Sequence, residues 1–294
     1  MPPRAAPYAR RMDDVTVASR PFRQVDVFAE AGLLGNPVAV VQDSIGLGTQ
    51  RMQAFTDWTN LSEATFLAPP THPDADYSVR IFCPGRELAF AGHPTLGTCH
   101  AWLEAGGTPK GDMIVQECDI GLVRIRRTAS RLAFAAPALR RQGPLDEPEL
   151  DLIVRGLGLQ RGDVVDHQWC DNGPPWRSIL LESAQQVLDI RPDETLLRGL
   201  DVGVVGPHPA GADADVEVRA FFTKGNGVAE DPVTGSLNAA LAQWLISTGR
   251  MGSSYTAAQG TVLGRRGRVH VEQSGEDIWI GGNCATVLQG TVTI

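Results

Sequence analysis

The sequence lacks several features that mark particular classes of protein. No apolar run in its 294 residues is long enough to cross a bilayer. The formal net charge is -8, so no basic field is present to attract nucleic acid or an anionic membrane surface. Residues 1–21 are rich in Arg and Pro but have no apolar segment of a signal peptide, and we expect them to form a loose leader. These absences favour a cytoplasmic protein that binds neither nucleic acid nor membrane.

The cysteines give no sign of a disulfide framework. The chain has five of them, an odd number at wide spacings and without a Cys-x-x-Cys motif: Cys83, Cys99, Cys118, Cys170 and Cys284. This pattern is typical of reduced thiols in a cytoplasmic protein. We interpret these residues as small buried apolar side chains.

Several common catalytic and cofactor motifs are also missing. There is no Gly-x-Ser-x-Gly nucleophile motif. The Gly-Asn-Gly at 225–227 lacks the third glycine of a dinucleotide fingerprint, and residues 92–98 match part of a phosphate loop without its lysine. His93, Cys99 and His100 are not spaced three or four residues apart, as ligands on one helix face would be. We therefore predict that the protein uses no metal and no cofactor.

The chain is rich in strand-like segments. Its length and its 43% of hydrophobic residues are enough to bury a large core. Residues 25–41 read as two strands around a turn at 35–37, and residues 49–59 have helical spacing. A second helix is expected near Asp231. Further strands are predicted from alternating or β-branched runs at 63–69, 77–84, 121–127, 131–137, 176–183, 216–222, 268–273 and 277–282.

One motif occurs twice, as a polar residue followed by Pro, two spacers and Gly, at 93–97 and at 231–235. Pro is favoured at the first position of a helix, which predicts that His93 and Asp231 occupy the N-cap positions of two helices. The glycine that ends each motif costs roughly 1 kcal/mol inside a helix. Since that cost occurs at the same place in both copies, we infer that something approaches the backbone closely there.

The repeat suggests two similar halves that face each other across a pseudo-twofold axis. We predict an N-terminal lobe at 22–135, to which a closing strand near 285–294 returns, and a C-terminal lobe at 145–284, with the Pro-rich segment 136–150 as the linker. Two helix N-termini in one cleft would hold a small anion such as a carboxylate. The nearby His93, Asp231 and Ser236 would then move protons on it.

Four segments, in this order, resemble the PhzF family of phenazine biosynthesis proteins: "GNPVAVV" at 35–41, "NLSEATF" at 60–66, "RIFCPGRELAFAGHPTLGT" at 80–98 and "EDPVTGS" at 230–236. The similarity runs from about Phe22 to the end of the chain. The resemblance implies the diaminopimelate-epimerase fold, an α+β architecture of two pseudo-symmetric lobes, each a strand barrel around a central helix. It also implies a homodimer, for which the apolar segment that closes the chain is a candidate interface.

The resemblance further implies cofactor-free isomerisation of a small anionic substrate in a biosynthetic process, as in trans-2,3-dihydro-3-hydroxyanthranilate isomerase. The family's catalytic positions match Glu63, as the acid–base carboxylate, with His93 and Asp231. Its substrate-binding positions match Gly92, Gly235 and Ser236. The sequence departs from the usual wording of the family at Cys83 and Ala89, which leaves the substrate more open than the reaction type.

Two alternative functions remain open from the sequence. One is a racemase or epimerase of an amino-acid-like substrate, although the two helix starts carry no cysteine pair of the kind that two-thiol epimerases use. The other is a non-catalytic binding protein that keeps the cleft. The combination of Glu63, His93 and Asp231 favours an enzyme, because a binding protein has no need of all three.

Overall fold

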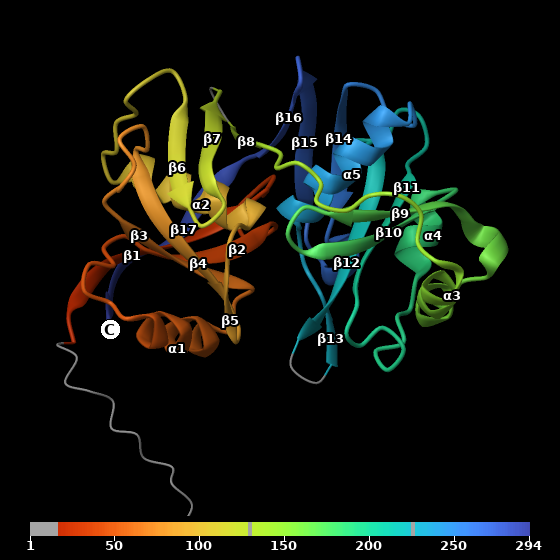
Figure 1. The fold of residues 1–294 in the computed structure, drawn as a ribbon, viewed down its shortest axis with the longest axis horizontal. Coiled ribbons are helices and arrows are strands. Elements are labelled where there is room, and N and C mark those ends of the chain that lie inside the picture. Colours follow the sequence, from red (N-terminus) through yellow and green to blue (C-terminus); the bar gives the residue numbers. More distant parts are fainter. Residues whose placement is uncertain (1–16, 129–130, 225–226) are drawn as a thin grey trace, which may run out of the picture.

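A computed structural model describes residues 17–128, 131–224 and 227–294 (Figure 1). We call the first group of elements the N-terminal half. It holds α1 (Thr49–Thr59), α2 (Gly92–Glu104) and the strands β1 (Ser19–Val27), β2 (Asn36–Val41), β3 (Glu63–Ala68), β4 (Tyr77–Cys83), β5 (Arg86–Leu88), β6 (Ile114–Cys118), β7 (Gly121–Arg127), β8 (Leu132–Ala135) and β17 (Cys284–Thr293).

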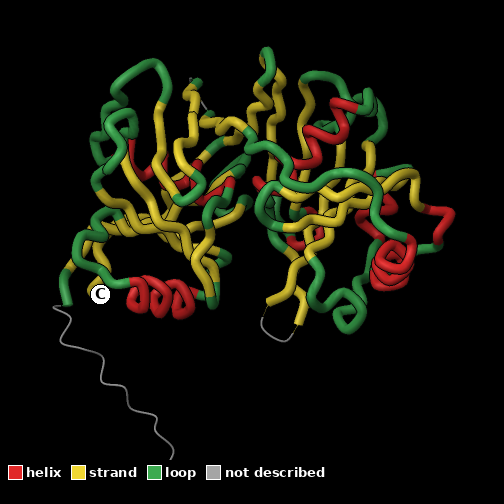
Figure 2. Tube along the Cα trace, in the orientation of Figure 1, coloured by secondary structure: helices red, strands yellow, loops and turns green. Residues whose placement is uncertain are grey.

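The remaining elements form the C-terminal half, beside the first in Figures 1 and 2. Its helices are α3 (Glu147–Gly156), α4 (Ala184–Asp189) and α5 (Gly235–Ser247), with short 3-10 turns at Arg161–Asp163 and Thr261–Leu263. Its strands are β9 (Val164–Asp171), β10 (Pro175–Leu181), β11 (Asp201–Pro207), β12 (Val216–Lys224), β13 (Gly227–Glu230), β14 (Ser254–Gln259), β15 (Gly267–Ser274) and β16 (Asp277–Gly282).

The two halves use the same local pattern of strand pairing. In the first, β4 forms a hairpin with β5 and pairs in parallel with β6, the strand that follows α2. In the second, β12 forms a hairpin with β13 and pairs in parallel with β14, the strand that follows α5. Each hairpin carries an arginine paired with a glutamate, Arg80 with Glu87 and Arg219 with Glu230. The antiparallel pairing of β8 with β16 joins the halves into one mixed structure of strands and helices.

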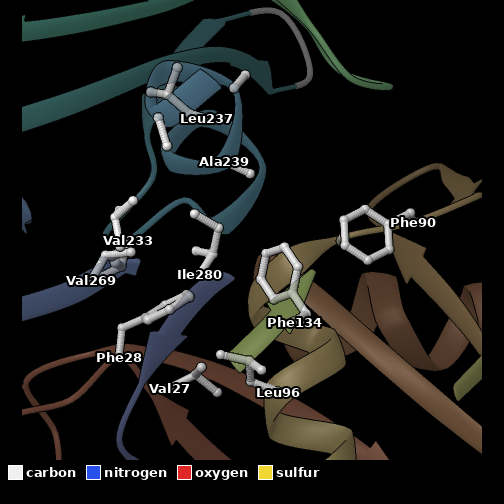
Figure 3. Close-up of a cluster of buried hydrophobic side chains, with 14 of the residues drawn as sticks. Val27, Phe28, Phe90, Leu96, Phe134, Val233, Leu237, Ala239, Val269 and Ile280 are labelled. Atoms are coloured by element: carbon white, nitrogen blue, oxygen red, sulfur yellow. The ribbon is translucent and has the colours of Figure 1, made fainter. Parts of the chain in front are cut away.

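The central helices α2 and α5 are buried on nearly all sides, which explains why neither shows a narrow apolar stripe in the sequence. Strands β1, β2, β3, β6, β8 and β17 surround α2, whereas α5 packs against β9, β15, β16 and α2 itself. Figure 3 shows Val27, Leu96 and Phe134 of the N-terminal half in one cluster with Ile280 and Leu237 of the C-terminal half. The hydrophobic core is therefore continuous across the junction of the halves.

The predicted helix starts were wrong by a few residues. Helix α2 begins at Gly92 with Ala91 as its N-cap, so His93 is the second helical residue. Helix α5 begins at Gly235 with Thr234 as its N-cap, so Asp231 lies before the helix. The carboxylate of Asp231 does not cap α5 because it accepts side-chain hydrogen bonds instead. Gly92 and Gly235 are therefore the equivalent residues, because each is the first residue of its helix, whereas the repeated motif had aligned Gly97 with Gly235.

Two segment boundaries also differ from the prediction. The expected leader 1–21 lies outside the described residues up to position 16, but Ser19–Pro21 belong to β1, since they pair with Thr293–Thr291 of β17. The expected linker 136–150 ends early, because α3 starts inside it. Asp146 caps that helix by accepting a hydrogen bond from the Glu149 N–H at 2.9 Å. The helix predicted at 49–59 is α1, with those same bounds.

None of the helices in the described ranges is long and apolar enough to cross a membrane.

Strand β17 is paired along one edge only, by β1, within the part of the chain that the structure describes. Ile294 and Ala18 exchange backbone hydrogen bonds of 3.1 Å, so by strand alternation Gln289, Thr291 and Thr293 direct their N–H and C=O groups away from β1. The segment 284–294 has no charged residue, although natural proteins commonly protect free edges with charges. In a chain of net charge -8, this neutral edge is a favourable place for two copies to meet.

We propose that β17 pairs antiparallel with β17 of a second copy, centred near Thr291, to form a homodimer. Replacing Thr291 by Pro removes one outward N–H without removing a bond to β1. We expect Thr291→Pro to sediment as a monomer at a micromolar concentration at which the wild-type protein and the matched Thr291→Val variant are dimers. A monomeric wild-type protein, or a dimeric Thr291→Pro protein, would contradict this interface.

Candidate active site

The N-termini of α2 and α5 touch each other at two glycines. A Cβ on Gly92 would lie 2.9 Å from the Cα of Gly235, and a Cβ on Gly235 would lie 3.0 Å from the backbone N of His93. A Cβ on Gly97 would lie 2.4 Å from a methyl group of Val38. The close approach expected from these glycines is therefore made by the protein itself. Only glycine at 92 and 235 allows the two helices to meet end to end.

Glu63 and His93 face each other at this junction. Glu63 opens β3, and its Oε2 lies 3.3 Å from the Nε2 of His93, the second residue of α2. The two atoms are buried, and neither takes part in a hydrogen bond within the described residues. Burial raises the pKa of Glu63 well above its usual value, and the charge of Asp231 raises it further, whereas Lys224 opposes the shift. A buried, unpartnered acid–base pair is the main chemical feature of the site.

Asp231 enters the site from the C-terminal half. Its Oδ1 accepts hydrogen bonds from Asn36 Nδ2 at 3.0 Å and Ser62 Oγ at 3.2 Å, and its Oδ2 accepts one from Thr234 Oγ1 at 2.6 Å. Burial raises the pKa of Asp231 to about 6, although these hydrogen bonds favour the ionised form. The pKa of Glu63 is raised as well, by burial first and then by the charge of Asp231, so the two carboxyl groups influence each other's ionisation. When the surroundings give two nearby carboxyl groups different pKa values, one commonly acts as the acid and the other as the base.

His93 is neutral, since burial lowers its pKa to about 3 while a hydrogen bond to the Pro37 carbonyl partly opposes the shift. Asn36 Nδ2 lies 3.4 Å from His93 Nδ1, but its two hydrogens are directed at Asp231 and at the carbonyl of Val233, each at 3.0 Å. Asn36 therefore donates both hydrogens to the C-terminal half, and Nε2 is the ring nitrogen of His93 that faces Glu63.

Ser236, the second residue of α5, occupies the position that corresponds to His93. Its Oγ accepts a hydrogen bond from Trp176 Nε1 at 3.1 Å, and its carbonyl accepts one from Asn172 Nδ2 at 2.8 Å. Within the described residues, no hydrogen bond links Ser236 to Glu63 or Asp231. The structure thus brings Glu63, His93 and Asp231 into one cluster and places Ser236 beside it.

The sequence prediction missed the polar residues that hold this cluster in place: Asn36, Ser62, Thr234 and Gln259. Gln259 donates to the backbone carbonyl of Asp231 at 3.1 Å and accepts from the Thr234 N–H at 3.0 Å. Asn36 and Ser62 lie in quoted motifs, and the available signal was a polar residue at or just before the start of an apolar strand. Their partners lie in the other half of the chain and could not be read locally.

A cavity of about 170 Å³ lies near the cluster and is bordered by residues 86–90 and 172–175 with Ile120 and Arg140. Asn172 connects it to Ser236 through the hydrogen bond described above. Glu63, His93 and Asp231 do not border it. Across 17–128, 131–224 and 227–294, no group of three or more His, Cys, Asp or Glu side chains is gathered as a metal site would require.

Comparison with known proteins places this geometry in a family. The family model described as phenazine biosynthesis-like protein matches residues 25–290. Antisense-enhancing sequence 1 of Schizosaccharomyces pombe is 35% identical, over 92% of this chain and 97% of that protein. Trans-2,3-dihydro-3-hydroxyanthranilate isomerase of Pseudomonas aeruginosa is 32% identical, over 90% of this chain and 96% of that protein.

Solved structures agree with the sequence comparisons. A PhzF-family protein of Enterococcus faecalis superposes with a TM-score of 0.77 at 25% identity, covering 94% of this chain and 100% of the other. A probable proline racemase of Agrobacterium radiobacter gives a TM-score of 0.60 at 14% identity, covering 94% of this chain and 93% of the other, which shows a shared fold alone. The chain has the fold of PhzF proteins and proline racemases. The protein is an isomerase. Within that class, the chain belongs to the PhzF family.

The neutral state of buried His93 predicts how stability depends on pH. Its pKa in the folded protein, about 3, lies below the ordinary 6.5, so its contribution is fully present above pH 6.5 and is lost as the pH falls towards 3. At pH 5 the loss amounts to about 2 kcal/mol. We expect the unfolding free energy of His93→Gln, from urea titrations at pH 7 and pH 5, to fall by about 2 kcal/mol less than that of the wild-type protein. Equal falls would contradict the assignment.

Proposed function

We propose that the protein is a cofactor-free isomerase that moves a proton between two carbon atoms of a small carboxylated substrate. The reaction would be similar to that of trans-2,3-dihydro-3-hydroxyanthranilate isomerase, the name borne by a relative that is 32% identical. The observation that carries this proposal is the pair of unpartnered buried atoms, Glu63 Oε2 and His93 Nε2, 3.3 Å apart. Buried polar atoms are normally paired, so an unpaired acid–base set indicates a partner supplied by the substrate.

Glu63 is the proton carrier in this proposal. A carboxyl group whose pKa is raised by burial can both give and take a proton near neutral pH. Glu63 in its acid form gives a proton to one carbon, and the carboxylate that results takes the proton released from the other carbon, which restores the acid form. Neutral His93 presents Nε2 to Glu63 at 3.3 Å, and the charge of Asp231 raises the pKa of Glu63 further.

The N-termini of α2 and α5 would bind the substrate carboxylate. The first turns of both helices carry unpaired N–H groups and a partial positive charge, which favour an anion. Because Gly92 and Gly235 are in contact, the two N-termini have to move apart to admit a substrate. Closure over the substrate would then bring Glu63 and Asp231, from opposite halves, to the same reacting atoms.

The alternatives from the sequence are less well supported. A two-thiol racemase needs a cysteine at each helix start, but the corresponding residues are His93 and Ser236. Cys83 is within electrostatic reach of Glu63, but burial raises the pKa of its thiol, so less of it is in the thiolate form that a thiol base requires. A binding protein would leave unexplained why Glu63 and His93 are buried without partners.

Replacing Glu63 by Gln keeps the shape of the side chain but removes its ability to carry a proton. General acid–base catalysis contributes about 10²–10⁴-fold, so we expect turnover and deuterium uptake from heavy water to fall by about that factor. The probe is trans-2,3-dihydro-3-hydroxyanthranilate, with mass spectrometry of substrate and product. Substrate affinity should persist. Deuterium uptake by Glu63→Gln at the wild-type rate would overturn the assignment.

Asp231→Asn should act differently, because it removes the negative charge that raises the pKa of Glu63. We expect Glu63 to titrate at a lower pH in this variant, as followed by the ¹³C NMR signal of its side-chain carboxyl. Both kcat and KM should worsen, since Asp231 also accepts three hydrogen bonds that order the site. An unchanged Glu63 titration would contradict the electrostatic link between the two carboxyl groups.

A further inference from the structure

Asn36 is a fully buried polar residue to which the proposed reaction assigns no role. It opens β2, and its exposed fraction is 0%. One side-chain nitrogen, Nδ2, reaches three groups: Asp231 Oδ1 and the Val233 carbonyl at 3.0 Å each, and His93 Nδ1 at 3.4 Å. Two of these groups belong to the C-terminal half and one to the N-terminal half. Among the described residues, no other side chain lies within hydrogen-bonding distance of both His93 and the Asp231 carboxylate.

We propose that Asn36 is a positioning residue that holds the Asp231 carboxylate of the C-terminal half against His93 and Glu63 of the N-terminal half. The inference rests on the proposed function, because it names the residue that assembles that same site. Asn36 itself does not carry a proton in the reaction. It acts through Asp231, whose place and charge it sets by hydrogen bonding.

The two carboxylate oxygens of Asp231 have different partners, and this difference shows which hydrogen bond links Asp231 to the N-terminal half. Oδ2 is held from its own half, by Thr234 three residues away in the chain. Oδ1 is held from the other half, by Asn36 and by Ser62. The Asn36 bond is the shorter of these two, at 3.0 Å against 3.2 Å, and the same nitrogen also binds Val233. Asn36 therefore fixes both the carboxylate and the backbone that leads into α5.

Asparagine is suited to this place because its amide offers two hydrogens and no charge. Both hydrogens are used on acceptors of the C-terminal half, so Asn36 ties that half to β2 without donating to His93. His93 presents its other ring nitrogen, Nε2, to Glu63 Oε2 at 3.3 Å. A carboxylate at position 36 would repel Asp231, and an apolar side chain would leave buried acceptors without donors.

The charged and titratable groups around Asp231 determine how its titration has to be read. Glu63 of β3 interacts with it electrostatically, His93 of α2 lies against the same Asn36 nitrogen, and Glu230 precedes it at the end of β13. Glu230 raises the pKa of Asp231, but its charge is paired with Arg219, and Lys224 acts on Glu63. Hydrogen bonds to an ionised carboxylate lower its pKa, so loss of the Asn36 donor should raise the pKa of Asp231 above its value of about 6.

The test is the titration of Asp231 in the free, full-length protein, by ¹³C NMR of side-chain carboxyls, with the signal assigned by its loss in Asp231→Asn. We expect Asn36→Leu to raise the midpoint by about one to two pH units, as expected for the loss of a hydrogen bond to a charged group. The matched control is Asn172→Leu. Asn172 is also buried and donates to the α5 backbone through Ser236, but it does not contact Asp231.

Asn36→Asp supplies a second variant of nearly the same shape, in case Asn36→Leu does not fold. Its added carboxyl group beside Oδ1 should also raise the Asp231 midpoint. A midpoint that is unchanged in the folded Asn36 variants, or that moves equally in Asn172→Leu, would overturn the proposal. The titration requires no turnover, so it remains decisive even if Glu63→Gln shows that the proposed reaction is wrong.

A second readout separates positioning from general loss of stability. In the deuterium-uptake assay, the acid limb of the pH profile should move to higher pH in Asn36→Leu, in parallel with the Asp231 midpoint. Asn172→Leu should lower thermal stability without moving that limb. A profile that only scales down in Asn36→Leu, with its acid limb in place, would contradict the role.

Discussion

The contact between the N-termini of α2 and α5 is the constraint on which the rest of the site depends. It is possible only because neither Gly92 nor Gly235 carries a Cβ. The contact sets His93 and Ser236 at corresponding positions just inside the two helices. It also closes the space around them, and the resulting burial moves the pKa of His93 to about 3. The geometry of two glycines thus determines the electrostatics of their neighbours.

Burial acts in opposite directions on the three ionisable groups of the site. It lowers the pKa of His93 and raises the pKa of Glu63 and of Asp231, whereas hydrogen bonds to Asp231 partly oppose the shift of that group. The polar network that supplies these bonds comes from both halves of the chain. The surrounding core is also shared, with Phe134 of β8 against α2 and Ile280 in the paired strand β16 (Figure 3). The ionisable residues of the site and the shared hydrophobic core therefore lie at the same junction between the two halves.

Much of the architecture was accessible to sequence reasoning, because strands and helices leave local patterns. The segment 49–59 reads as a helix through the spacing of Met52 and Phe55, and it is one. The helix starts at 92 and 235 were misplaced, since Pro94 and Pro232 suggested first helical positions. The actual caps are Ala91 and Thr234. Proline marks a preference for a helix start, but side-chain partners elsewhere decide which residue begins the helix.

The sequence by itself determined the family, the run of strands and the residue types available for acid–base work, because these depend on order and local pattern. Resemblance singled out Glu63, which its own surroundings in the sequence did not. Only the tertiary structure decided that Asn36 meets Asp231, 195 positions away, and that Glu63 and His93 lie unpaired side by side. The pKa values of these groups follow from burial and from such distant partners. A property that arises from residues far apart in the chain exists only once the chain is folded.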